Sequence, residues 1–174
     1  FCGSTSVTQS ASKSFFNQCF ATGKVTAANN DYAGGFIGYV YATSGEVGAD
    51  SIALTGCYAF GDVTGVGYTG GFVGCAKTAL GNGGRATLNF EKCYATGITL
   101  GTGSYAGGFA GELSSYGSVT DNNTYSYYST IKISNCYAGG SAQAAQVVGS
   151  FVGQTLATRG STTKRAPGRA RSAS

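Results

Sequence analysis

One phrase recurs four times along this chain, and the length of the recurrence restricts the fold more than any other feature. Its first half, Cys-(Tyr/Phe)-Ala-x-Gly, begins at Cys19, Cys57, Cys93 and Cys136. A second half, usually Gly-Gly-Phe-x-Gly, centres on Phe36, Phe72, Phe109 and Phe151. Self-similarity at a fixed period of this length is the signature of a stacked-repeat architecture.

The spacing within each repeat indicates which side of the coil varies. The Cys-to-Phe interval is 17, 15, 16 and 15 residues, whereas the return from Phe to the next Cys takes 18, 21, 21 and 27, counting from Phe1. Neighbouring repeats fix the stacked side of a solenoid, and insertions collect in loops on the other side.

The segments themselves read as strands. Three return segments show period-two alternation, namely Asp50–Leu54, Ala86–Phe90 and Ser129–Ile133, and no helical periodicity extends over ten residues. With the two halves of the phrase, this predicts three short strands per repeat, and glycines at corners or at positive φ. The predicted fold is an all-β, single-stranded parallel β-solenoid of about four coils.

In such a solenoid equivalent residues stack at the spacing of paired strands, roughly 4.8 Å. The sequence predicts a Cys ladder and three aromatic ladders. The Cys ladder is Cys19, Cys57, Cys93 and Cys136; the first aromatic ladder is Phe1, Phe36, Phe72, Phe109 and Phe151; the second is Phe20, Tyr58, Tyr94 and Tyr137; and the third is Tyr32, Tyr68 and Tyr105, followed by Val147. We interpret these ladders as core and not as a ligand platform.

The charge of the chain divides it into two parts. Residues 1–154 carry six Lys and Arg against seven acids, whereas residues 155–174 carry five basic residues and no acid. We therefore expect a β-solenoid domain over 1–154 and a basic C-terminal tail over 155–174. The tail residues are Arg159, Lys164, Arg165, Arg169 and Arg171. A basic arm of this kind binds an anionic partner or stays solvated.

The longest insertion, residues 114–130, is polar and rich in Tyr. A protruding loop of this composition is a candidate contact surface, because Tyr supplies contact area at low entropic cost. Its candidate binding residues are Tyr116, Tyr125, Tyr127 and Tyr128.

Taken together, the two halves of the phrase resemble the GLUG motif of repeats in large bacterial cell-surface and secreted proteins. The matching segments are Asn135–Ala138, Cys93–Gly97 and Gly71–Gly74, with Phe in place of the aliphatic residue of the family. The resemblance covers most of residues 1–154. It implies a β-solenoid in an extracellular adhesin, stalk or filament, and it carries over no catalytic residue.

Catalytic and metal chemistry find little support in the composition. The chain has no His, and its seven acids occupy different repeat positions, so neither a Ser-His-Asp site nor a paired-carboxylate site is expected. We expect no enzyme, cofactor or metal. Six cysteines permit three disulfides, but the strand spacing exceeds the Cβ separation of a disulfide, so a ladder of buried thiols is an equal alternative. Cys2 is the candidate for a bond between subunits.

Two functional hypotheses follow. The chain opens with Phe1-Cys2-Gly3, which aligns with Phe36-Ile37-Gly38, and we expect an open solenoid edge there. Stacking of that edge on Phe151 and Val152 of another copy, helped by the basic tail, would give a head-to-tail extracellular filament or surface fibre. The alternative is a non-enzymatic adhesin module, a segment of a larger surface protein that recognises glycans or proteins through its loops. Neither hypothesis involves nucleic acid. Membrane insertion is not expected either, since no run of 18 apolar residues occurs.

Overall fold

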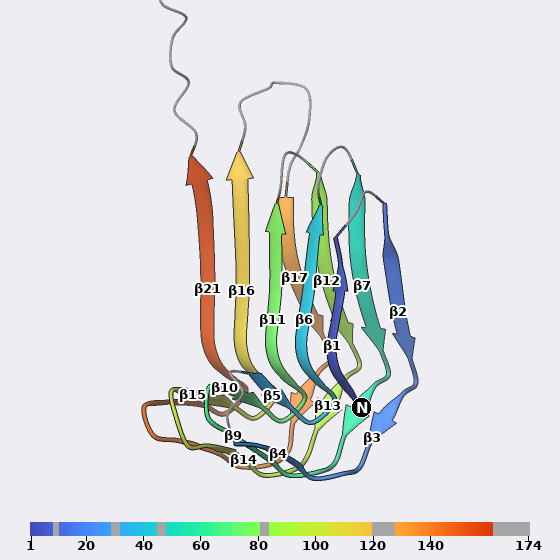
Figure 1. Ribbon diagram of the computed structural model, residues 1–174. Coiled ribbons are helices and arrows are strands. Elements are labelled where there is room, and N and C mark those ends of the chain that lie inside the picture. Colours follow the sequence, from blue (N-terminus) through green and yellow to red (C-terminus); the bar gives the residue numbers. More distant parts are fainter. Residues whose placement is uncertain (9–10, 29–31, 45–47, 81–83, 120–127, 162–174) are drawn as a thin grey trace, which may run out of the picture.

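The computed structural model describes residues 1–8, 11–28, 32–44, 48–80, 84–119 and 128–161. Every regular element in these ranges is a β-strand, and every pairing between strands is parallel (Figure 1). The predicted all-β parallel β-solenoid is confirmed.

The strands form five sheets, each of which collects one strand from every turn of the chain. The first, called the long sheet here, contains β1 (Cys2–Val7), β6 (Ile37–Ser44), β11 (Val73–Leu80), β16 (Ala110–Val119) and β21 (Val152–Ser161). The second, called the return sheet, contains β2 (Lys13–Asn17), β7 (Ala49–Thr55), β12 (Arg85–Glu91) and β17 (Tyr128–Ser134). The three predicted return segments all lie in this sheet.

Three further sheets of two- and three-residue strands close the coil at one end of the long strands (Figure 1). One contains β3 (Phe20–Ala21), β8 (Tyr58–Ala59), β13 (Tyr94–Ala95) and β18 (Tyr137–Ala138). The next contains β4 (Val25–Ala27), β9 (Val63–Gly65), β14 (Thr99–Gly101) and β19 (Ala142–Ala144). The last contains β5 (Tyr32–Gly34), β10 (Tyr68–Gly70), β15 (Tyr105–Gly107) and β20 (Val147–Gly149).

The prediction of three strands per repeat was wrong, because a run such as β7 to β11 contains five. The first half of the phrase and the residues that follow it do not form one strand, because the chain turns after Ala59 and a new strand begins at Val63. The segment around Phe72 likewise divides into β10 and β11 at Gly71. Two-residue strands leave no alternation to read, so sequence periodicity merges them.

Two predicted boundaries also change. β21 continues to Ser161, so the boundary expected between residues 154 and 155 falls inside a strand and 155–161 belong to the solenoid. The insertion expected to protrude from 114 to 130 is shorter, because β16 includes residues 114–119 and β17 begins at Tyr128. The polar residues of 114–119 and 155–161 show little apolar alternation, so the sequence did not indicate that they form strands. These two segments pair with each other in the long sheet, and β17 pairs with β12 in the return sheet.

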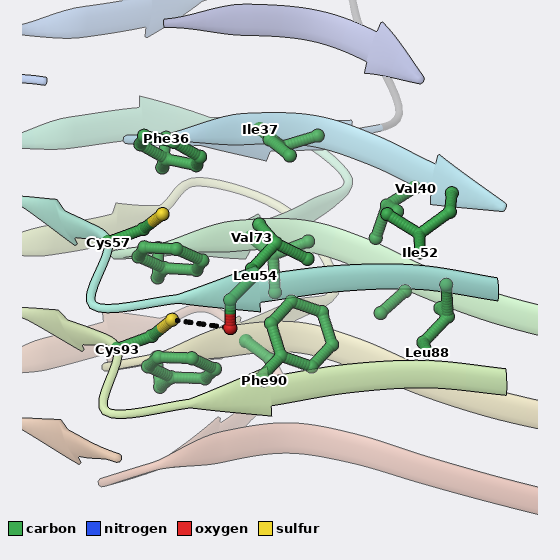
Figure 2. Close-up of a cluster of buried hydrophobic side chains, with 14 of the residues drawn as sticks. Phe36, Ile37, Val40, Ile52, Leu54, Cys57, Val73, Leu88, Phe90 and Cys93 are labelled. Carbon is green, nitrogen blue, oxygen red and sulfur yellow. Dashed lines mark hydrogen bonds between the residues drawn. The ribbon is translucent and has the colours of Figure 1, made fainter. Parts of the chain in front are cut away.

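The core lies between the long sheet and the return sheet (Figure 2). It is built from in-register aliphatic and aromatic side chains, since the parallel ladders place Ile52 beside Leu88 and Leu54 beside Phe90. The fully buried large side chains include Phe36, Phe72, Phe90, Phe109, Ile37, Ile52, Leu54 and Leu88. Burial at this density supplies most of the driving force for folding.

Glycine occupies fewer strained corners than predicted. Positive φ occurs at the residue before each ladder cysteine, which is glycine only at Gly56. The equivalent residues Gln18, Lys92 and Asn135 adopt φ of 51°, 53° and 53°. Most glycines in the described ranges instead sit where a Cβ would collide with the backbone of an adjacent coil.

Candidate functional site

The ladder residues predicted from the sequence stack as expected. The Phe rings at positions 1, 36, 72, 109 and 151 follow one another at centroid distances of 4.7, 4.9, 4.9 and 4.8 Å, all nearly parallel. Phe20, Tyr58, Tyr94 and Tyr137 stack at 5.3, 4.9 and 4.8 Å. In the first ladder Phe36, Phe72 and Phe109 are fully buried, whereas Phe20 and Tyr137, the end rings of the second ladder, are exposed.

The Cys ladder is a column of free thiols at the bend between the return sheet and the β3-β8-β13-β18 sheet (Figure 2). Cys57 and Cys93 are fully buried. The Cys93 Sγ donates to the carbonyl oxygen of Leu54, one coil below, at 3.3 Å. Cys136 repeats this contact with Phe90 O at 3.5 Å. All six cysteines are free, so of the two alternatives left open by the sequence the thiol ladder is the one observed.

The outer face near Tyr39 contains a polar row that sequence reasoning did not identify. Tyr39, Cys75 and Glu112 pair across β6, β11 and β16. Burial raises the pKa of the Cys75 thiol to about 12, with the nearby Glu112 charge adding to the effect. Burial likewise raises the pKa of Tyr39 and of Tyr68 to about 12. A thiol with a raised pKa is a poor nucleophile, so this row favours structure over covalent chemistry.

The candidate assembly residues lie at the two edges of the long sheet. Phe1, Cys2 and Gly3 belong to or adjoin β1, and the Phe1 side chain is 66% exposed. Phe151 and Val152 lie at β21, the opposite edge of the same sheet. Arg159 is in β21, whereas Lys164, Arg165, Arg169 and Arg171 lie outside the described residues.

The candidate binding residues are not gathered in one loop. Tyr116 lies in β16, with the Lys77 Nζ 4.9 Å from its ring centroid. Tyr128 begins β17, with the Arg85 Cζ 5.0 Å from its ring centroid. Tyr125 and Tyr127 lie outside the described residues. Both placed tyrosines are therefore held by a cation from the preceding coil.

A groove that the sequence did not indicate lies at the β1 end of the solenoid. It has a volume of about 370 Å³ and is lined by β1, β4, β5 and Gly38. Its lining includes Val25, Ala27, Tyr32 and Ala33. The Gly-Gly-Phe phrase is the sequence feature that could have indicated it, since the strand before each Phe pairs with the equivalent strand of the next repeat.

A cluster of metal-binding side chains and a membrane-spanning helix are both absent from the residues with described placement. No cluster of three or more His, Cys, Asp or Glu side chains in those ranges is arranged to hold a metal ion. In the same ranges there is no helix of the length and apolarity needed to cross a membrane.

Comparison of the chain with protein-family models, with curated proteins and with solved structures finds no match. The resemblance to the GLUG motif therefore stays an expectation from the quoted residues alone.

Proposed function

We propose that this chain is a non-enzymatic structural subunit of an extracellular filament or cell-surface fibre, and that it acts as a rigid shaft extended through its solenoid ends. The observation that carries the proposal is the unbroken register, in which equivalent residues pair strand by strand through all five sheets. The extracellular location is supported by the resemblance alone.

Rigidity follows from how the coils contact each other. Each coil is joined to the next by backbone hydrogen bonds at the bends as well as in the strands, such as Phe36 N to Phe72 O at 2.9 Å. The ring ladders add aromatic contacts worth about 0.5–1.5 kcal/mol per pair beyond area burial. Bending the shaft would break several of these ladders together, which is the property that a stalk or fibre requires.

The two edges of the long sheet define how copies would join head to tail. Pairing β1 of one copy with β21 of another continues the Phe ladder from Phe151 to Phe1. The long sheet has five strands and each other sheet has four. At such a junction each of the other four sheets therefore lacks one strand between the two copies, and the joint depends on the single pair formed by β21 and β1.

Electron microscopy and sedimentation of the purified chain at rising concentration test this proposal. The expected result is end-to-end fibres with an axial repeat of about 24 Å, because each copy adds five strands at about 4.8 Å to the long sheet. A chain ending at Ser161 should assemble equally well if β21 forms the joint. Monomers alone at high concentration would overturn self-assembly.

The alternative function, a binding module for glycans or proteins, is supported by the exposed Tyr128 at the rim opposite the short strands. Glycan and protein arrays probed with the monomeric chain would distinguish it. A ligand lost in a Tyr128→Ala chain, with no fibres in the micrographs, would favour this alternative.

A further inference from the structure

The column of ladder thiols repeats one geometry from coil to coil. Figure 2 shows the sulfur atoms of Cys57 and Cys93 pointing the same way from consecutive coils. Three Sγ atoms donate in the same manner to a carbonyl oxygen of the preceding coil: Cys57 to Phe16 at 3.5 Å, Cys93 to Leu54 at 3.3 Å and Cys136 to Phe90 at 3.5 Å. These acceptors are themselves paired in register. Because sulfur and acceptor both advance by one coil, consecutive Sγ atoms are separated by the strand spacing, roughly 4.8 Å.

The aromatic residue after each cysteine has the same spacing. The ring centroids of Tyr58 and Tyr94 are 4.9 Å apart, and those of Tyr94 and Tyr137 are 4.8 Å apart. A metal–thiolate bond is about 2.3 Å long in zinc sites, so an ion midway between two sulfurs holds them ~4.6 Å apart. The column therefore has the spacing for one ion coordinated linearly by two thiolates.

Carbonyl oxygens surround the column. Each Sγ also lies near the carbonyl oxygen two residues earlier in its own coil: Thr55 for Cys57 at 3.5 Å, Glu91 for Cys93 at 3.4 Å and Ser134 for Cys136 at 3.3 Å. A thiol has one proton and donates to one oxygen at a time. Two carbonyl dipoles directed at each sulfur make the local potential negative, which favours a cation in the column.

The column also supplies thiolates, the form of cysteine that binds metals. The backbone N–H of Cys93 donates to the Cys136 Sγ at 3.3 Å. Hydrogen bonding with Cys93 lowers the pKa of Cys136 to about 7 and the pKa of Cys57 to about 6. Hydrogen bonds with Cys136 and Cys57 raise the pKa of Cys93, which keeps its proton. An ionised thiol thus lies next to a protonated one.

We propose that the thiol column is a binding site for soft monovalent metal ions such as Cu(I), each held linearly between the sulfurs of two consecutive coils. Thiolates are the ligands that select Cu(I) over harder ions. Two ions use all four thiols, one between Cys19 and Cys57 and one between Cys93 and Cys136. The site goes beyond the proposed function and does not depend on fibre formation.

The binding step exchanges a proton for a metal ion. The ion bonds to the ionised Cys136 and to Cys93, whose proton passes to solvent, and no electron is transferred. The net charge of the pair is therefore the same before and after binding, so no further charge is buried. A site with two ligands differs from a cluster of three or more metal-binding side chains, which is absent from the described ranges.

The test begins with a chain that keeps only the ladder thiols. Cys2 pairs with Ile37, and Cys75 pairs with Tyr39 and Glu112, so Cys2→Ala and Cys75→Ala remove thiols that have no cysteine beside them. The reduced chain is titrated without oxygen with Ag(I), a redox-inert ion of the same class, and examined by native mass spectrometry. Two bound ions per chain are expected. Binding of none, or of more than two, would overturn the proposal.

Two double variants of that chain separate adjacency from thiol count. Cys57→Ala with Cys136→Ala leaves Cys19 and Cys93, two coils and ~9.6 Å apart. Cys93→Ala with Cys136→Ala leaves Cys19 and Cys57 on consecutive coils. Both variants keep two thiols, and circular dichroism checks that both fold. Affinity for Cu(I), measured by competition with a coloured chelator, should be at least tenfold lower in the first variant. Equal affinities would contradict linear binding between coils.

Two further measurements do not depend on the folding of the double variants. X-ray absorption of the Cu(I)-loaded ladder chain should show two sulfur neighbours and no third ligand, and three sulfurs or a nitrogen ligand would overturn the geometry. An ion held by the folded column stabilises the native state, so it should raise the melting temperature. An unchanged or lower melting temperature would show that the ions bind the unfolded chain equally well, and would also overturn the proposal.

Discussion

At the scale of single residues, the coils approach so closely that side chains are excluded from particular positions. Gly71 is the clearest case, since its missing Cβ would meet a backbone oxygen at 2.2 Å and the Ala95 Cβ at 3.1 Å. Backbone cannot move aside as the end of a flexible side chain can, so the whole coil would shift. The glycine content is thus a packing requirement here and not a mark of flexibility.

Gly71→Ala should lower the free energy of unfolding by about 1–3 kcal/mol or more, the range for overpacking a dense interior. The matched control is Gly3→Ala, where nothing lies within 4 Å of the added Cβ. Urea denaturation of both variants measures the difference. Equal stability of the two would contradict the close approach of the coils.

The residue before each ladder cysteine has a left-handed backbone, and there a change to glycine is expected to raise the stability of the protein instead of lowering it. Lys92 adopts φ of 53° and is exposed, and the left-handed region costs a residue with a Cβ about 1–2 kcal/mol. Lys92→Gly should therefore stabilise the protein by up to about 1 kcal/mol after the entropy that glycine loses on folding. Gly56→Ala, at φ of 62°, should destabilise it. Thermal melts of both variants check the pair.

The polar row of Tyr39, Cys75 and Glu112 predicts that the protein loses stability at alkaline pH. Burial raises the pKa of Cys75 from 9.0 to about 12, so the unfolded chain releases this proton first as the pH rises. The stabilising contribution is complete below pH 9 and is lost between about pH 9 and 12. Tyr39, raised from 10.0 to about 12, acts in the same direction. Denaturation of wild type and Cys75→Ala from pH 8 to 11 should show a shallower fall in the variant. An identical slope would contradict the assignment.

At the scale of strands and ladders, each element is stabilised by its neighbours in adjacent coils. Two-residue strands such as β8 and β13 have no stability of their own, and they persist because each pairs on both sides. Inward residues of the last coil, including Ile131 and Ile133, are only half-buried, whereas Leu88 and Phe90 of the preceding coil are fully buried. Stability is therefore greatest in the central coils, as expected for a quasi-one-dimensional stack.

The Phe ladder offers a direct measure of this gradient. Phe72 is fully buried between Phe36 and Phe109, so Phe72→Ala should cost about 3–5 kcal/mol. Phe15, which is 71% exposed, is the matched control, and its substitution by Ala should change stability by no more than about 0.5 kcal/mol. If equilibrium denaturation finds comparable losses of stability in the Phe72→Ala and Phe15→Ala variants, Phe72 lies outside the core.

At the scale of the whole molecule, the two ends are sheet edges of different composition. The β1 edge is apolar and glycine-rich around the groove, and the β21 edge is a ten-residue strand of mainly polar residues. β21 extends the solenoid at least to Ser161, and it includes seven residues, 155–161, that the charge pattern assigned to a tail.

Truncation distinguishes this extent from the boundary that charge alone predicted. A chain ending at Ser161 keeps β21, and a chain ending at Gln154 retains only its first residues and exposes the backbone of β16. We expect the shorter chain to melt at a clearly lower temperature than the one ending at Ser161. Equal melting temperatures measured by circular dichroism would show that residues 155–161 contribute nothing to the sheet.

The sequence by itself determined the parallel solenoid and the identity of its ladders, because Phe36, Phe72 and Phe109 or Cys57 and Cys93 recur at one repeat position and in-register stacking is the arrangement that brings them together. The return strands could be predicted equally well, since seven-residue strands such as β7 and β12 alternate inward and outward residues.

Only the tertiary structure decided the number of strands per coil, the end of β21 at Ser161, the free state of the thiols and the groove beside Gly38. These features depend on where the backbone of one coil lies against the next, to within a few tenths of an ångström. Repeat spacing carries the order of the coils, but the distance between Gly71 and Gly108, or the direction of the Cys93 Sγ toward Leu54, arises only when the coils are packed.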